Sequence, residues 1–382
     1  MFIIAVTAFG GPQAHLAMML QRFVHKRKYL SEEELMELNA LCQMLPGPGS
    51  TQTLMAIALK LGGRLLAVIT LFVWVVPSLI LMSLLVIGFN FLDKRDFDPK
   101  HYRFIQPMAI GFIAFAGFRI GTTVLKSNAG MALMVLACVV SILIHSPWVF
   151  PAVLVFAGIA SNFFNKSRGE IFHGDEPLRW KMSMYNIALF FSVFILAGVC
   201  SIVFKYRPVV LFENFYRFAS LTFGGGQVLV PMMYEQFVKH RHYISGSEFV
   251  SGYVMAQAIP GPAFSFAAFT GGMALRDLGA NMQLLGCLIG TVAIFLPGVF
   301  FIFFIYPFWN YLKSYRVVKR SLEGINAAAT GLVLSAAVLL YKELQPDWMN
   351  IVVCVSTFCL LNFTRIPGPV LVVVAVLLGV FL

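Results

Sequence analysis

Two proline-glycine motifs hold the residues whose types and spacing are best suited to binding an anion. The first motif, QMLPGPGSTQ, is centred on Gly47, and the second, QAIPGPAFS, is centred on Gly261. A pair of prolines removes two backbone donors and ends a helix, so a new helix can begin directly behind each motif. The first amides of a helix are free and lie at its positive dipole end. Such helix starts are typical anion seats, and broken helices at membrane depth line cavities.

A glycine-rich motif precedes each proline motif at the same spacing. FGGPQAH begins at Phe9 and FGGGQ begins at Phe223. Consecutive glycines interrupt a helix and let two backbones approach closely, so we interpret these motifs as the partners of the proline breaks. Helix packing through small residues is the alternative role for the glycines. A simple kink or a tight hairpin is the alternative role for the prolines.

Neutral donors and two basic side chains complete the predicted site. Gln43 and Gln257 lie one turn before the prolines and would donate amide hydrogens to the anion. His15 is either a proton-responsive or anion-contacting group or a structural hydrogen bonder. Arg119 either balances the charge of the anion or extends to the membrane interface. The predicted binding residues are Gly10, Gly11, His15, Gln43, Gly47, Gly49, Ser50, Thr51, Gln52, Arg119, Gly224, Gly225, Gly226, Gln227, Gln257, Gly261 and Ser265. The predicted helix breaks are Pro12, Pro46, Pro48, Pro260 and Pro262.

Acidic residues are absent from the segments around the proline motifs. No Asp or Glu occurs in residues 38–92, 104–167 or 249–276. Proton- and cation-coupled carriers usually keep buried carboxylates in their path, so this pattern favours an anion as the substrate. The sequence holds no metal-binding, phosphate-loop or catalytic-triad motif. We therefore expect neither an enzyme nor a bound metal or other cofactor.

The composition is that of a polytopic membrane protein. Of the 382 residues, 59% are hydrophobic and 12% are charged, whereas soluble domains carry roughly 25% charged residues. Apolar runs of about 20 residues suit helices that cross a bilayer. The net charge of +11 comes from basic residues at segment ends, which face lipid headgroups. The lipid bilayer and a small oxyanion are thus the expected partners, nucleic acid is not, and a homodimer stays open.

The chain is an internal duplication. An offset of 214 residues, from Phe9 to Phe223, also aligns the two proline motifs, and beyond them an offset of 220 aligns Pro77 with Pro297. So many ordered matches indicate a fused repeat. We expect a first transmembrane repeat over 1–163, a linker with an extra transmembrane helix over 164–208, and a second transmembrane repeat over 209–382.

The expected fold class is an all-α polytopic membrane protein with two homologous halves and broken helices at the FGG and PGP motifs. The extra helix is expected at about 183–205. One helix between two six-crossing repeats puts them in opposite orientations, so we expect inverted repeats. Whether the first two segments of each repeat cross or re-enter stays open. Segment 63–92 would be about 45 Å long as a helix, longer than a bilayer core of about 30 Å, so we expect tilt or a kink at Pro77.

At these motifs the sequence resembles the chromate ion transporter family. The resemblance rests on FGGPQAH with QMLPGPGSTQ in the first half and on FGGGQ with QAIPGPA in the second. It covers nearly the whole chain, in the fused two-copy form. The family often has a glycine where the first half has Ala58, whereas Gly272 keeps it in the second half. The resemblance implies a multi-pass protein of the cell membrane that exports chromate from the cytoplasm, with sulfate as its structural mimic.

The expected function is therefore a secondary transporter of chromate or a related divalent oxyanion. The substrate site would lie between the halves near the midplane, and one half would rock against the other to give alternating access. A sulfate importer or exchanger is the first alternative. A membrane scaffold or lipid-handling protein, whose helix breaks serve packing alone, is the second. Transport direction and the coupling ion stay open.

Overall fold

The fold is built from helices, and no strand occurs in the residues that the structure describes. The computed structural model describes residues 2–8, 11–93, 104–124, 127–144, 149–164, 180–222, 229–309, 316–342, 344, 347–364, 366 and 368–381. The first half contains α1 (Phe2–Thr7), α2 (Gly11–Met19), η1 (Leu20–Lys26), α3 (Glu32–Met44), α4 (Gly49–Asp93), α5 (Ile105–Val124), α6 (Asn128–Leu143) and α7 (Val149–Phe164). It is followed by α8 (Trp180–Phe204). The second half contains α9 (Arg207–Leu221), α10 (Leu229–Tyr234), η3 (Glu235–His240), α11 (Gly246–Gln257), η4 (Ala263–Ser265), α12 (Phe266–Ala274), η5 (Arg276–Leu278), α13 (Ala280–Ile305), η6 (Tyr306–Phe308), α15 (Arg316–Lys342), α16 (Trp348–Phe363) and α17 (Gly368–Phe381).

The two halves repeat the same local structure at the positions that the offset of 214 predicts. A capping box starts α3 at Ser31, and another starts α11 at Ser245. In each box the serine hydroxyl accepts from the amide three residues on, and the glutamate there accepts from the serine amide. The π-helical segments η1 and η3 also correspond. Each is followed by a residue at positive φ, Lys28 at 53° and His242 at 52°.

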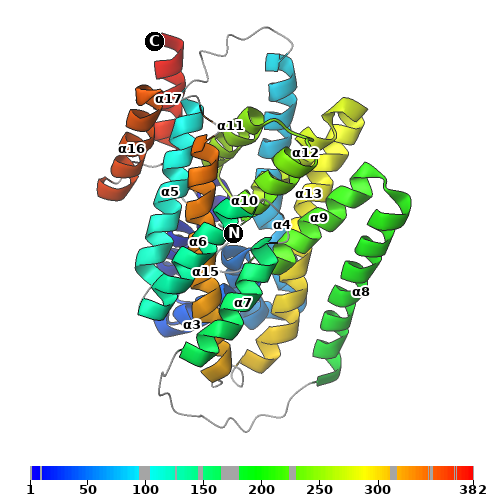
Figure 1. The fold of residues 1–382 in the computed structure, drawn as a ribbon. Coiled ribbons are helices and arrows are strands. Elements are labelled where there is room, and N and C mark those ends of the chain that lie inside the picture. Colours follow the sequence, from blue (N-terminus) through cyan, green and yellow to red (C-terminus); the bar gives the residue numbers. More distant parts are fainter. Residues whose placement is uncertain are drawn as a thin grey trace.

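Corresponding elements run in opposite directions. Figure 1 shows α3 near the lower end of the view and α11, its counterpart, near the upper end. The part of α4 that follows Gly63 rises towards the upper end, whereas α13 descends from it. In the same view α5 descends and α15 ascends. This arrangement is that of inverted repeats, as expected from the odd number of helices between the halves.

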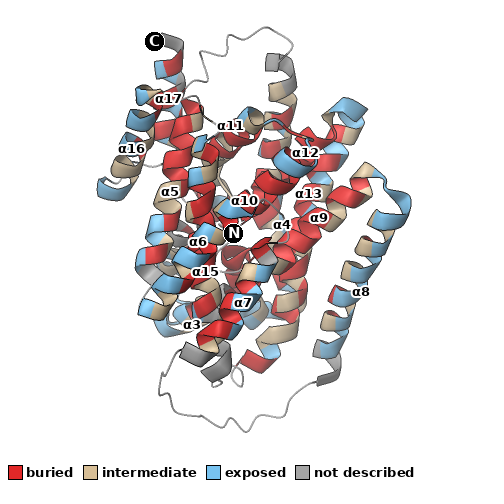
Figure 2. Ribbon diagram, viewed as in Figure 1, coloured by how far each residue is buried: buried red, intermediate tan, exposed pale blue. Residues whose placement is uncertain are grey.

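The halves interlock rather than standing side by side. The second-half helix α15 packs against α5, α6 and α7 of the first half, and Ser335 on α15 donates to Ser141 Oγ on α6 over 3.0 Å. The second-half helix α13 packs against α4 as well as against α9 and α12. Figure 2 shows that buried residues concentrate in these central helices. Small side chains allow this close packing of helices in a membrane.

The extra helix α8 lies at the periphery and packs against the second half. Its contacts are with α9 and α13, and the Tyr216 hydroxyl of α9 donates to the Phe190 carbonyl of α8 over 3.0 Å. Most of its other side chains are exposed or half-buried (Figure 2). An apolar helix that packs against the protein on one side only is typical of a membrane span that faces lipid on its other side.

Five described helices are long and apolar enough to cross a membrane. The spans are Gly49–Phe89, Ile105–Thr122, Met184–Phe204, Ala280–Phe308 and Glu323–Lys342. In the first of these, the backbone leaves helical geometry at Gly62 and at Gly63, whose φ is +74°. The chain stays helical through Pro77. The interruption therefore falls at the glycine pair and not at the proline, because glycine alone reaches positive φ without strain.

Candidate functional site

Each proline motif is hydrogen-bonded to the segment that precedes the glycine motif of the other half. The Gly47 amide donates to the Thr222 carbonyl over 2.7 Å. The Gly261 amide donates to the Ala8 carbonyl over 2.9 Å. The offset of 214 relates both donors and both acceptors, so the two bonds are one contact made twice. We call this reciprocal arrangement the crossover.

The glycines of the crossover have a backbone geometry that other residues rarely adopt. The φ angle is +109° at Gly47 and +125° at Gly261. A Cβ atom on Gly47 would lie 3.2 Å from the Gly298 Cα, and one on Gly261 would lie 2.7 Å from the Ser78 Cβ. Ser78 and Gly298 correspond by the offset of 220, and each follows the proline inside its helix, Pro77 or Pro297. Each motif thus packs against the long helix of the opposite half.

The first proline motif separates two helices. Helix α3 ends at Met44, Leu45 is extended, and α4 begins at Gly49. The Gln52 side chain folds back across this break, because its Nε2 donates to the Pro46 carbonyl over 3.0 Å. The same Nε2 donates to the Gly298 carbonyl over 3.3 Å. Gln52 therefore joins the start of α4 both to the break and to the opposite half.

Four buried side chains form a polar cluster at the start of α4, where Ser50 and Thr51 contact His15 and Trp74. His15 on α2 has its Nδ1 3.2 Å from Ser50 Oγ, and its ring meets the Trp74 ring edge to face at 5.2 Å. The Trp74 indole donates to Thr51 Oγ1 over 3.1 Å. All four side chains are buried. His15 therefore belongs to a packed polar cluster next to the break.

The second proline motif is held by the first half. Pro262 precedes a single turn, η4, in which the Ser265 amide donates to the Pro262 carbonyl over 2.9 Å. Ser265 Oγ lies 2.7 Å from Ser78 Oγ on α4. Trp74 and Ser78 are one turn apart on α4, so this one turn contacts the helix starts behind both breaks. Gln257 is half-buried and is the last residue of α11.

Other predicted residues lie elsewhere or outside the described residues. Gly10, Gly224, Gly225, Gly226 and Gln227 are outside the described residues, and only the backbone of Gln43 and Pro12 is described. Gly11 is the first residue of α2. Arg119 is exposed on α5, with its guanidinium 5.8 Å from the Phe115 ring centroid. This position leaves Arg119 outside the buried cluster at the break.

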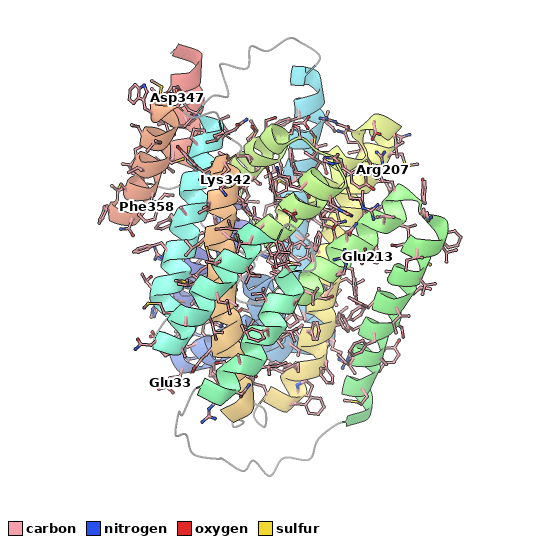
Figure 3. The ribbon with its side chains drawn as sticks, viewed as in Figure 1. Glu33, Arg207, Glu213, Lys342, Asp347 and Phe358 are labelled. Carbon is pink, nitrogen blue, oxygen red and sulfur yellow. The ribbon has the colours of Figure 1, made fainter. Side chains whose placement is uncertain are left out.

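A buried charged group on α9 was not predicted from the sequence. Arg217 donates through Nε to the Glu213 carboxylate over 2.6 Å and through Nη2 to Asn214 Oδ1 over 2.7 Å. In Figure 3, Arg207 is labelled near the upper end of the view and Glu213 is labelled below it on α9. The spacing of four residues within an apolar run is the signal that could have found it. Helix α9 leads directly to Thr222 of the crossover.

Ion pairs hold the outer ends of the half-helices that flank each break. Lys60 on α4 pairs with Glu34 on α3, and Arg276 in η5 pairs with Glu248 on α11. The Lys60 ammonium and the Ser31 amide hold the pKa of the exposed Glu34 carboxyl below its usual range. Within the described residues there is no group of three or more His, Cys, Asp or Glu side chains that could hold a metal ion.

Comparison with known proteins identifies the family. The family model described as "Chromate transporter" matches residues 1–162 and again residues 209–380. The chain belongs to the chromate transporter family. The two matches fall on the two halves, and the chain is a multi-pass membrane protein of a transporter family.

Relatives in this family are similar over most of their length. A chromate transport protein of Cupriavidus metallidurans is 22% identical over 97% of this chain and 88% of its own length. One from Pseudomonas aeruginosa is 25% identical over 85% of this chain and 76% of its own. A protein of Methanocaldococcus jannaschii, named only as an uncharacterized transporter, is 22% identical over 94% and 87%. No solved structure matches the chain significantly.

Proposed function

We propose that this protein is a secondary transporter that exports chromate, or a related divalent oxyanion such as sulfate, across the cytoplasmic membrane by alternating access. The observation that carries the proposal is the crossover, in which the two proline motifs of a chromate transporter family member exchange hydrogen bonds between inverted halves. Two relatives named as chromate transport proteins support chromate as the substrate.

The donors for the anion are those at the start of α4. The amides of Gly49, Ser50 and Thr51 have no acceptor within the helix and lie at its positive end. The hydroxyls of Ser50 and Thr51 stand beside them, positioned by His15 and Trp74. Fixed dipoles of this kind stabilise an anion in a site with little water. Neutral donors also release the anion more easily than a buried cation would.

Alternating access follows from the symmetry of the crossover. The Gly47–Thr222 contact and the Gly261–Ala8 contact are equivalent and oppositely oriented. Rocking of one half would open one contact to one side of the membrane while the other contact stays closed. Export of an anion from a negative-inside cell is favourable by about 2.3 kcal/mol per charge per 100 mV. Such transport needs no buried acid in the path.

Flux in reconstituted vesicles tests the proposal. With equal chromate on both sides and an imposed potential, chromate should move towards the positive side. Gln43→Ala and Gln257→Ala should reduce the flux, whereas Gln21→Ala, at an exposed position on η1, should not. Concentrative sulfate movement into the cell-interior side would favour the importer. Absence of flux for every tetrahedral anion would favour the scaffold.

A further inference from the structure

The Gln52 amide is locked in one orientation. Its Nε2 has two hydrogens, and both are used, one towards the Pro46 carbonyl and one towards the Gly298 carbonyl. Rotating the amide by half a turn would place Oε1 against two carbonyl oxygens, which repel it. Pro46 belongs to the first half and Gly298 to the second. Both halves together therefore fix the orientation of the amide, with Oε1 as its free acceptor.

Within the part of the chain that the structure describes, this acceptor has no partner. Gln52 is 1% exposed, and within the described residues no donor lies within hydrogen-bonding distance of Oε1. Buried polar atoms in folded proteins are nearly always paired, so an orphan acceptor points to a group that is bound during function.

A fully deprotonated oxyanion cannot pair with this acceptor, because all its oxygens are acceptors too. A singly protonated oxyanion can, since it brings one hydroxyl group. Hydrogen chromate keeps its proton up to near-neutral pH, whereas sulfate and selenate are fully deprotonated there. The protonation state therefore distinguishes chromate from tetrahedral anions of nearly the same size.

We propose that the site takes up chromate as the singly protonated hydrogen chromate ion, with Gln52 Oε1 accepting its hydroxyl proton and the first amides of α4 donating to its other oxygens. This inference rests on the proposed function. It gives the transporter a basis for rejecting sulfate, because a site built to bind a hydroxyl discriminates strongly against an analogue that lacks it. A bound ion of single charge also costs less to desolvate than a dianion.

Titratable protein groups near this turn are few. On the elements packed against the start of α4, and on α4 itself, the charged or titratable residues are His15, Glu32, Glu33, Glu34, Glu37, Cys42, Lys60, Arg64, Asp93 and Cys287. Of these, His15 lies beside Ser50 at the break, and the pair Glu34–Lys60 joins the start of α3 to the part of α4 just before Gly62. His15 is thus the protein group whose titration has to be separated from that of the substrate.

Flux of chromate and of selenate through wild-type vesicles, at equal pH on both sides, tests the inference without any substitution. Above neutral pH the chromate flux should fall about tenfold per pH unit, following the hydrogen chromate concentration. Selenate should be transported about tenfold to a hundredfold less than chromate at pH 6.5, given the cost of leaving a buried acceptor unpaired. A chromate flux that is level from pH 6.5 to 8.5, with selenate transported equally well, overturns the inference and leaves the proposed function standing. Absence of any flux defeats the proposed function itself.

Two variants separate the substrate proton from a protein proton. Gln52→Leu should bring the ratio of chromate to selenate flux close to one, whereas the exposed Gln21→Leu should keep the wild-type ratio. His15→Asn should leave the midpoint of the chromate pH profile unchanged. If Gln52→Leu lowers both fluxes but keeps their ratio, Gln52 is structural and the inference fails. If the pH dependence disappears in His15→Asn, the proton belongs to the histidine and the inference fails as well.

Discussion

Replacement of Gly261 by alanine is the perturbation whose cost follows most directly from the crossover. The residue has φ at +125°, and an added Cβ would lie 2.7 Å from the Ser78 Cβ. Holding alanine in a sparsely populated backbone region costs roughly 1–3 kcal/mol, and overpacking costs roughly another 1–3 kcal/mol. Gly261→Ala should therefore lower the free energy of unfolding by about 2–6 kcal/mol. Thermal unfolding in detergent measures this loss, and vesicle flux should fall with it.

A second substitution divides the cost into its two parts. Ser78→Gly copies the residue that the other half has at Gly298, and it removes the Cβ that the new methyl group would meet. In a double-mutant cycle, the combination with Gly261→Ala should recover about 1–3 kcal/mol, the overpacking part alone. Gly88→Ala is the matched control, because Gly88 is helical on α4 with nothing within 4 Å of an added Cβ. Equal stability of Gly261→Ala and Gly88→Ala, or absence of coupling to Ser78, would refute the crossover geometry.

Three further outcomes are expected. Trp74→Phe keeps the aromatic contact but loses the indole hydrogen bond, so it should cost about 1 kcal/mol in thermal unfolding and weaken chromate binding severalfold in titration calorimetry. Arg217→Ala leaves the half-buried Glu213 carboxylate without its cation and should cost about 1–3 kcal/mol, whereas Arg217→Lys should recover part of that loss. Equal unfolding temperatures for both variants and wild type would contradict the pair. The pKa of Glu34 is lowered in the folded state by Lys60, so its stabilising contribution is present above the unfolded pKa and is lost as the pH falls. Between pH 7 and pH 4 the unfolding temperature of the wild type should therefore fall slightly more than that of Glu34→Gln, and parallel curves would show that the ion pair contributes nothing.

The repeat made much of the fold predictable from the sequence. Once the offsets of 214 and 220 are known, every element of one half has an expected counterpart, and α6 and α16 correspond end to end. The serines that cap α3 and α11 and the prolines that end them act locally, through their own backbone neighbours. Local rules of this kind can be read without knowledge of the tertiary structure.

The crossover could not be predicted in the same way. The Gly47 amide needs a hydrogen-bond acceptor, but no local sequence pattern indicates that this acceptor is the Thr222 carbonyl of the other half. Trp74 is one aromatic residue in a long apolar run, and its hydrogen bond to Thr51 depends on how α4 folds back at Gly62 and Gly63. Contacts between distant segments are decided by packing, which hydrophobic periodicity alone does not encode.

The central claim is that the anion rests where the proline breaks of the two halves meet. Anomalous scattering from chromium, in crystals of the reconstituted or detergent-solubilised protein soaked with chromate, tests it most directly. The account predicts a peak with oxygens within hydrogen-bonding distance of the first amides of α4 and of the Gln52 side chain. A peak beside Arg119 or Arg217, with the start of α4 empty, would contradict it.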